Sequence, residues 1–579
     1  MTSETKVKVA FVLFSTVLAT LGAARMYWSW PDAPWQSSLW FIDDIDHFLK
    51  GDFSNVTWFV FGESWSMNGY RWFQYVSAQF FHFDTRLENL VYFFLTNVLS
   101  LLVGLTALGS SKRGTAGGVT WIVFLIPPVI MSLSGAGSRG MELGTFAGLV
   151  LIVLLFIYIS TERRKFYFEI ISSVLAFGST FVLLGGYVAG ATFSLLATAF
   201  VYSRYQHRKP RVRYQLIFAS AVTFLATVGH FLTTLVTRLE STVTPVAALV
   251  NQLSHDPLFP LKYLFWASVN SIMSANTGEM LGSDGSWLLV VGGCVIVGIT
   301  VFALARQSLD NSHLPPAALL LVFYGAGTAL LLLVYRNTYS DELLAPWYSL
   351  HFKVALAGAL WFLAIKGVQL KKYGNLSKHV ASSAAVVLLV LVVISNWLQF
   401  ARGDSERAYF LNVASAALMP STLAVPAGET NTQLVLPLDA SLQAIGILQE
   451  HKLSVFKDPE VNPVKIFGGL PSAVTIPALP ADHWAGKQLD IQPIGENCND
   501  LRIEVRKNVE IPNQVLEISD TNGLSEIYAV HDGLVLSSKT LNGNKPLKFT
   551  FTSTWVPSEN SDSTDTRNLS NLVLITCSN

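Results

Sequence analysis

Three carboxylates stand within four positions near the start of this chain. Asp43, Asp44 and Asp46 belong to the stretch FIDDIDHF, and Glu63 follows in the same polar interval. A carboxylate within hydrogen-bond reach of a hydroxyl group can remove its proton, which is general-base catalysis. Such a base needs no metal, although paired carboxylates could also hold a divalent cation. The competing interpretation is structural, because acidic residues also cap short helices or stay solvated in a loop.

Three arginines offer a complementary chemistry, the binding of phosphate. Arg71, Arg139 and Arg336 stand in polar intervals between long apolar runs. A guanidinium group can hold a phosphate through two parallel hydrogen bonds and can offset the charge on a departing phosphate. Structural roles compete here as well. Arg71 and Arg336 suit helix ends at a membrane interface, and Arg139 could simply pair with Glu142 in a glycine-rich turn.

His351 and Lys353 are further candidates, because both follow the apolar start of a run. A charged side chain at the middle of a bilayer costs at least about 2.5 kcal/mol, so such residues face protein or water. For His351, a hydrogen bond between two helices is the favoured structural alternative.

Composition indicates which elements must position these groups. The chain has 579 residues, of which 51% are hydrophobic and only 13% charged, whereas soluble domains carry about 25% charged residues. Apolar runs near 20 residues recur, about the length that crosses a bilayer, and a chain in lipid must be helical. The sequence therefore predicts an α-helical polytopic membrane protein with about eleven spans. They are expected near 8–28, 89–109, 117–134, 143–160, 167–185, 187–203, 214–236, 286–305, 315–335, 346–366 and 379–398.

The positions of Lys and Arg predict the orientation. Basic clusters fill alternate intervals, at 111–113, 162–165, 204–213 and 366–378. Because such clusters stay in the cytoplasm, the N-terminus is expected inside. The transmembrane domain (1–400) then sits in a cytoplasmic (inner) membrane, with its loop 29–88 and everything after about residue 400 facing the periplasm or the outside. No P-loop or GxGxxG precedes a helix, and the basic clusters are explained by topology, so neither nucleotide chemistry nor nucleic-acid binding is expected.

The tail is polar and is expected to form an extracytoplasmic part of mixed α/β to β-sandwich type. Residues 401–480 include LDASLQAIGILQEHKLSVF, which is typical of an amphipathic helix followed by a strand. Residues 481–579 contain short alternating runs between turn signals, which favours a β-sandwich. These runs are DLRIEVRK, EIYAVHDG, LKFTFTSTW and NLVLITC. An exported domain can hold a disulfide, so a Cys498–Cys577 bond is predicted, with two unpaired thiols as the alternative. No Cys/His spacing predicts a metal site.

A long acidic first outer loop, many spans and an exported tail together resemble the GT-C class of integral-membrane glycosyltransferases. FIDDIDHF stands where that class has its first-loop acidic motif, and NGYRWFQYV is similar to an arginine-bearing aromatic stretch of bacterial members. The resemblance implies a sugar donor linked to polyprenyl phosphate, a glycan or glycolipid acceptor, and an Asp or Glu base. Asp43 is then the expected base, with Asp44 next and Glu63 in reserve. Arg71, Arg139 and Arg336 would bind the donor phosphate.

Other function classes stay open. A transporter or flippase of lipid-linked glycans would also be polytopic, but it would place charges at mid-membrane and show related halves. The middles of most predicted spans here are free of charge, and no repeat stands out. A non-enzymatic scaffold would use the exported tail to bind glycan or protein and would need no carboxylates and arginines. An enzyme that polymerises lipid-linked glycans is a variant of the first interpretation. The sequence leaves the sugar, the acceptor and the stereochemistry open.

Overall fold

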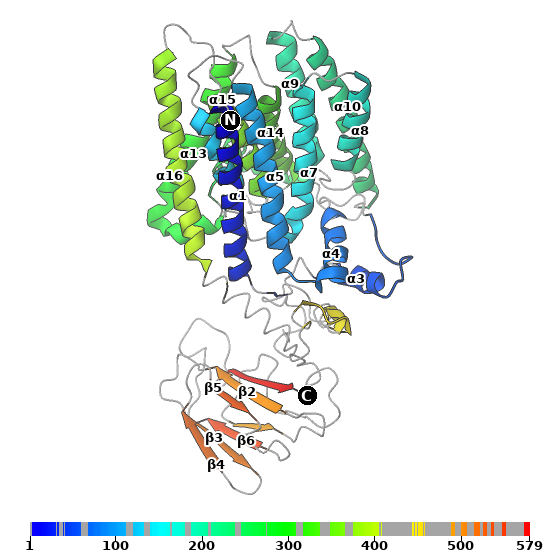
Figure 1. Ribbon diagram of the computed structural model, residues 1–579, viewed down its shortest axis with the longest axis vertical. Coiled ribbons are helices and arrows are strands. Elements are labelled where there is room, and N and C mark those ends of the chain that lie inside the picture. Colours follow the sequence, from blue (N-terminus) through cyan, green and yellow to red (C-terminus); the bar gives the residue numbers. More distant parts are fainter. Residues whose placement is uncertain are drawn as a thin grey trace. The chain divides into compact units, whose positions relative to one another are not determined.

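The computed structural model describes most of the helical part of the chain and shorter stretches of its tail. The described residues are 3–30, 32–33, 39, 41–59, 68–111, 120–132, 139–161, 165–179, 187–205, 210–237, 245–273, 275–308, 316–335, 348–364, 374–403, 407, 443–444, 446–448, 450–454, 457, 488–491, 500–506, 515–520, 525–529, 534–537, 547–551 and 572–578. They are mostly helical and divide into two compact units (Figure 1). The first unit combines Met1–Ser29, Thr57–Phe73 and Arg86–Glu406, and the second combines Trp30–Val56, Gln74–Thr85 and Arg407–Asn579.

The first unit is a helical bundle. Its helices are α1 (Ser3–Ser29), α5 (Arg86–Ser111), the 3-10 helix η1 (Thr120–Leu125), α6 (Ile126–Ile130), α7 (Arg139–Ser160), α8 (Lys165–Phe177), α9 (Val188–Tyr205), α10 (Pro210–Thr237), α11 (Pro245–His255), α12 (Phe259–Val269), α13 (Ala275–Ser308), α14 (Pro316–Tyr335), α15 (Ser349–Ala364) and α16 (Gly374–Ala401). Another helix, α4 (Asn68–Phe81), begins in this unit and ends in the second.

Five described helices are long and apolar enough to cross a membrane. They comprise Glu4–Ser29, Arg86–Ser110, Pro210–Leu232, Pro316–Val334 and His379–Ala401. The chain is therefore a helical protein of the membrane-embedded kind, as the composition predicts. Each of the predicted intervals holds helical residues, but the total number of spans stays a prediction. The interval 117–134 differs in form, because its helix changes from 3-10 to α just before Pro127 and Pro128, which lack the N–H that a continuous helix needs.

The faces of the outer helices fit a lipid environment. On α1, Leu13, Val17 and Leu21 recur every four residues, and each is more than half exposed. Buried Phe11 and Ala19 lie on other sides of the same helix, which packs against α5 (Figure 1). An apolar stripe left exposed along a long helix is the pattern expected where lipid replaces water as the solvent.

The centre of the bundle is built from closely packed helices. Every described side chain of α15 except that of Ala355 is buried, and α14 packs against both α9 and α15. Small residues allow this close approach, as is common in membrane bundles. A Cβ atom at Gly358 of α15 would lie 2.8 Å from the backbone oxygen of Ala318 of α14. The glycine therefore fixes how near these two helices come.

The second unit contains both short helical elements and strands. The helix α3 (Ile42–Leu49) and the C-terminal part of α4 belong to it, as do helical residues between Gln443 and Glu450. Its strands are β1 (Gln488–Ile491), β2 (Asp500–Arg506), β3 (Val515–Asp520), β4 (Ser525–Ala529), β5 (Leu534–Ser537), β6 (Leu547–Phe551) and β7 (Leu572–Ser578).

The strands form two antiparallel sheets, in the orders β1-β6-β3-β4 and β5-β2-β7. The four alternating runs picked out in the sequence coincide with β2, β4, β6 and β7. On the central pair, Ile518 of β3 lies opposite Phe549 of β6, and both side chains are buried. Whether the two sheets make a sandwich in an exported domain stays a prediction. Cys498 lies outside the described residues and Cys577 is placed only as part of β7, so the predicted disulfide also stays a prediction.

Candidate functional site

The acidic stretch of the first loop forms helix α3. Ile42 and Ile45 lie three positions apart and are buried, so they fix one side of the helix against the rest of its unit. Asp43, Asp46 and Lys50 follow at spacings of three and four, which places them together on another side. Carboxylates in the first turn also suit the positive end of the helix dipole.

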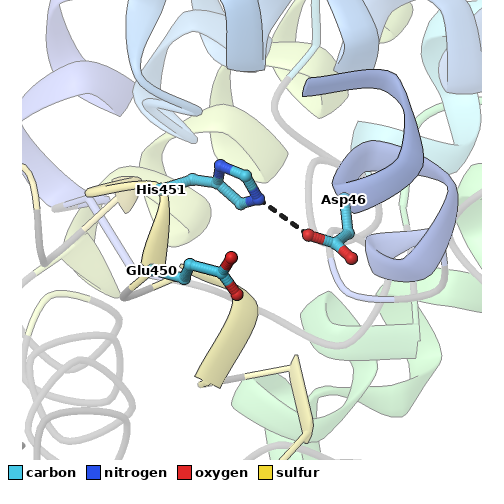
Figure 2. Close-up of side chains that lie close together, drawn as sticks. All are labelled: Asp46, Glu450 and His451. Carbon is cyan, nitrogen blue, oxygen red and sulfur yellow. Dashed lines mark hydrogen bonds and ion pairs between the residues drawn. The ribbon is translucent and has the colours of Figure 1, made fainter. Parts of the chain in front are cut away.

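A segment from the tail meets this polar side of α3. His451 Nε2 lies 2.7 Å from Asp46 Oδ1, although the two residues are 405 positions apart (Figure 2). Gln443 Nε2 donates to Asp43 Oδ1 at 2.9 Å, across 400 positions. Lys50 Nζ lies 2.8 Å from Asp46 and 3.2 Å from Glu450. Two of the acidic groups of α3 are therefore held by side chains from the tail.

The charges around Asp46 keep it ionised. Burial raises the pKa of the Asp46 carboxyl, but the hydrogen bonds from Lys50 and His451 outweigh burial and hold the pKa below its ordinary value. The hydrogen bond to Asp46 raises the pKa of Lys50 in turn. Asp46 and His451 are each 17% exposed, so the pair is shielded on most sides but still reaches the surface.

A second contact ties the same tail segment to the first loop. Lys457 Nζ donates to Asp32 Oδ2 at 2.6 Å and to Asp84 Oδ2 at 2.8 Å. Asp32 also accepts a hydrogen bond from Ser454 Oγ at 3.1 Å and from the backbone N–H of Thr85 at 3.0 Å. We call Asp32, Asp84 and Lys457 the lysine clasp. It joins the residue stretches around positions 32, 84 and 457 without using α3.

Ring stacking connects α3 with α4. The rings of Phe48 and Tyr75 stack with centroids 5.0 Å apart and planes 14° from parallel. Beyond this contact, α4 buries Gln74 and Tyr75 and leaves Val76, Phe80 and Phe81 exposed, with Phe80 at 72%. An exposed apolar side on a helix of this kind suits a membrane interface better than water.

Asp46, Glu450 and His451 also offer donor atoms of the kind that bind a divalent cation, all within 4.8 Å of one another. The arrangement around them does not fit a metal. The ammonium group of Lys50 touches both carboxylates, and the 2.7 Å contact between Asp46 and His451 is that of a hydrogen bond. The positive charge of this cluster is therefore supplied by Lys50.

The candidates from the sequence are placed as follows. Asp43 is exposed and bonded to Gln443, and Asp44, one position on, is half-buried. Arg71 is buried and donates to the backbone oxygen of Thr57 at 3.1 Å. Arg139 is the first residue of α7, but its side chain is not among those that the structure describes. Glu63 and Arg336 lie outside the described residues.

His351 and Lys353 lie in the helical bundle. Tyr324 of α14 and His351 of α15 are joined by a 2.8 Å hydrogen bond through Nδ1, so the predicted bond between helices is confirmed. Lys353 Nζ donates to the backbone oxygen of Ser132 at 3.0 Å. Both side chains are buried, and the Nε2 atom of His351 has no hydrogen-bond partner among the described residues.

The sequence did not single out His451, Glu450 or Gln443. A signal was present, because the segment LDASLQAIGILQEHKLSVF is amphipathic and its polar positions at Gln443 and Glu450 are seven residues apart, two turns of a helix. The pattern does not indicate which residues those two positions contact. Comparison of the chain with protein-family models, with curated proteins and with solved structures found no match.

Proposed function

We propose that this protein is a membrane glycosyltransferase. It moves a sugar from a polyprenyl-phosphate carrier to a glycan or glycolipid acceptor on the outer face of a cytoplasmic membrane. The observation that carries the proposal is the acidic side of α3, fixed by Gln443, Lys50 and His451, on a helix whose Phe48 stacks against apolar-faced α4.

The chemistry of such a transfer asks for these features together. The carrier is a lipid, so its sugar is presented at a membrane surface, which the exposed Val76, Phe80 and Phe81 of α4 suit. The acceptor is a hydroxyl group, which becomes a better nucleophile when a nearby base takes its proton. The acidic groups of α3, or a group held by them, would supply that base. The candidate arginines would bind the phosphate of the donor, and Arg71 is the one nearest in sequence to α3.

The proposal is tested with the full chain reconstituted in phospholipid vesicles. A panel of radiolabelled undecaprenyl-phosphate hexoses and pentoses is added together with a glycolipid extract from bacterial envelopes. We expect label to move from the carrier to the extract in a protein-dependent manner, with empty vesicles as the control. Folded protein that transfers label from no donor would overturn the proposal. Label that crosses the vesicle membrane while still attached to its carrier would indicate a flippase.

A further inference from the structure

The imidazole of His451 lies in an arrangement that can accept a proton. Its Nε2 atom faces Asp46 Oδ1 at 2.7 Å. The lowered pKa of Asp46 keeps that carboxylate ionised, so it can only accept a hydrogen bond, and the proton lies on Nε2. In the neutral ring, Nδ1 then carries the free lone pair. Within the part of the chain that the structure describes, no hydrogen-bond partner lies on Nδ1.

A histidine is better suited to this task than an exposed aspartate. General bases work best when their ordinary pKa lies near the pH of the reaction, and imidazole is the side chain that titrates there. The imidazole is also held in one tautomer by its carboxylate partner, as in other His–Asp pairs. Among the described residues, the charged groups beside His451 are Asp46, Lys50 and Glu450.

We propose that His451, oriented by Asp46, is the general base of the transfer reaction, an inference that rests on the proposed function. His451 Nδ1 takes the proton of the acceptor hydroxyl. The hydroxyl oxygen bonds to the anomeric carbon of the donor sugar, and the bond from that carbon to the phosphate oxygen breaks. The bond's electron pair leaves with the polyprenyl phosphate. The proton remains on the imidazolium ring, whose charge Asp46 offsets, until water removes it.

The chain offers a matched control in a second His–Asp pair. His47 Nδ1 lies 3.1 Å from Asp52 Oδ2, and both side chains are more exposed than the first pair, at 40% and 38%. Asp52 is held further by Asn55 and Ser54, at 2.6 and 2.8 Å. His47 stands on α3 next to Asp46 but has no part in the proposed chemistry. Replacing it tests whether any imidazole in this region affects the reaction.

The experiment measures transfer from the active donor of the panel, in vesicles, as a function of pH. We expect His451→Gln to lower kcat/KM by about 10²- to 10⁴-fold and to abolish the fall in activity that protonated imidazole causes at acidic pH. His47→Gln should leave both rate and pH profile unchanged. Asp46→Asn, a change in a positioning residue, should lower the rate while its remaining activity keeps the pH dependence of an imidazole.

Chemical rescue separates a proton-transfer role from a structural one. His451→Ala should regain activity when free imidazole is added, with a pH dependence that follows the added base. If wild-type protein transfers sugar and His451→Gln does so equally well with the same pH profile, His451 is not the base and the proposed function stands. If neither transfers sugar from any donor of the panel, the proposed function falls and the role of His451 falls with it.

Discussion

Lys457 and Asp32 form an ion pair at 2.6 Å between positions that are 425 residues apart. The same ammonium group also contacts Asp84 at 2.8 Å. Asp32 is 10% exposed and Asp84 is 20% exposed, so the carboxylates of the lysine clasp depend on Lys457 as a counter-charge with little help from water. The clasp therefore holds the tail segment to the first loop.

We expect Lys457→Met to loosen this attachment and to cost about 1–3 kcal/mol, because two largely buried carboxylates lose a charged donor. Lys452→Met is the matched control, since Lys452 is exposed in the same turn and takes part in no interaction that the structure describes. Limited proteolysis should cut the tail segment faster in Lys457→Met only. Equal rates in the two variants would show that the clasp adds nothing to the attachment.

The clasp should also respond to pH, in a direction that the pKa of Lys457 determines. Burial lowers the pKa of Lys457, but the hydrogen bonds to Asp32 and Asp84 raise it by more than burial lowers it. The folded pKa therefore lies above the ordinary 10.5. A raised lysine pKa stabilises the folded state below the unfolded pKa, and this stabilisation is lost as the pH rises through the folded value. On the alkaline side of neutral pH, we expect proteolysis of the tail segment to become faster only as the pH passes the folded pKa of Lys457, and no such acceleration in Lys457→Met.

Asn variants on α3 distinguish two interpretations of the acidic stretch. If Asp43 or Asp44 is the base, one of Asp43→Asn and Asp44→Asn should lose about 10²- to 10⁴-fold in transfer rate. If His451 is the base, both variants should stay within about tenfold of wild type, since a lost hydrogen bond is worth about 1 kcal/mol. We expect the second result. A large loss in either variant together with an active His451→Gln would assign the base to α3.

Two glycines test the packing of the bundle. Gly358→Ala places a Cβ atom 2.8 Å from the backbone oxygen of Ala318, whereas a Cβ at Gly298 would meet nothing within 4 Å. Alanine favours a helix by up to about 1 kcal/mol over glycine, so Gly298→Ala should be neutral or stabilising. Gly358→Ala should instead destabilise by about 1–3 kcal/mol through overpacking. Thermal unfolding in detergent checks this, and a higher Tm for Gly358→Ala would contradict the close packing of α14 and α15.

Topology is tested separately. The basic clusters predict that residues 401–579 lie outside the cytoplasm. Protease added to intact spheroplasts should therefore remove the tail and leave the N-terminus protected. A reporter fused after Asn579 that is active only in the cytoplasm would overturn this orientation and, with it, the proposed placement of α3.

The sequence was most informative where the signal is local. Each interval that hydropathy predicts as a span contains helical residues in the structure. A helix that crosses lipid or packs inside a bundle needs a long apolar run, and such a run is visible in the sequence. Alternation likewise marked β2, β4, β6 and β7. The helices α11 and α12 were not predicted, since each has only 11 residues and falls short of a span.

The site was harder to predict for a physical reason. The acidic run itself drew attention to α3, and a bond between helices was expected for His351. The partners of Asp43 and Asp46, however, come from positions 400 and 405 residues later. No periodicity within either segment encodes which distant side chain will face it. The emphasis on Asp43 and Asp44 therefore missed the histidine bonded to their neighbour.

The long separation between Asp46 and His451 has a consequence for biosynthesis. At 5–20 residues per second, a ribosome needs about 20–80 s to make the 405 positions between them. During that time α3 is already released from the ribosome, but Gln443, His451 and Lys457 do not yet exist. The carboxylates of the first loop therefore lack their partners from the tail while the helical bundle is inserted. A chain that stops before residue 443 would contain the whole bundle and still lack the imidazole, so the site is completed only after the membrane part has been made.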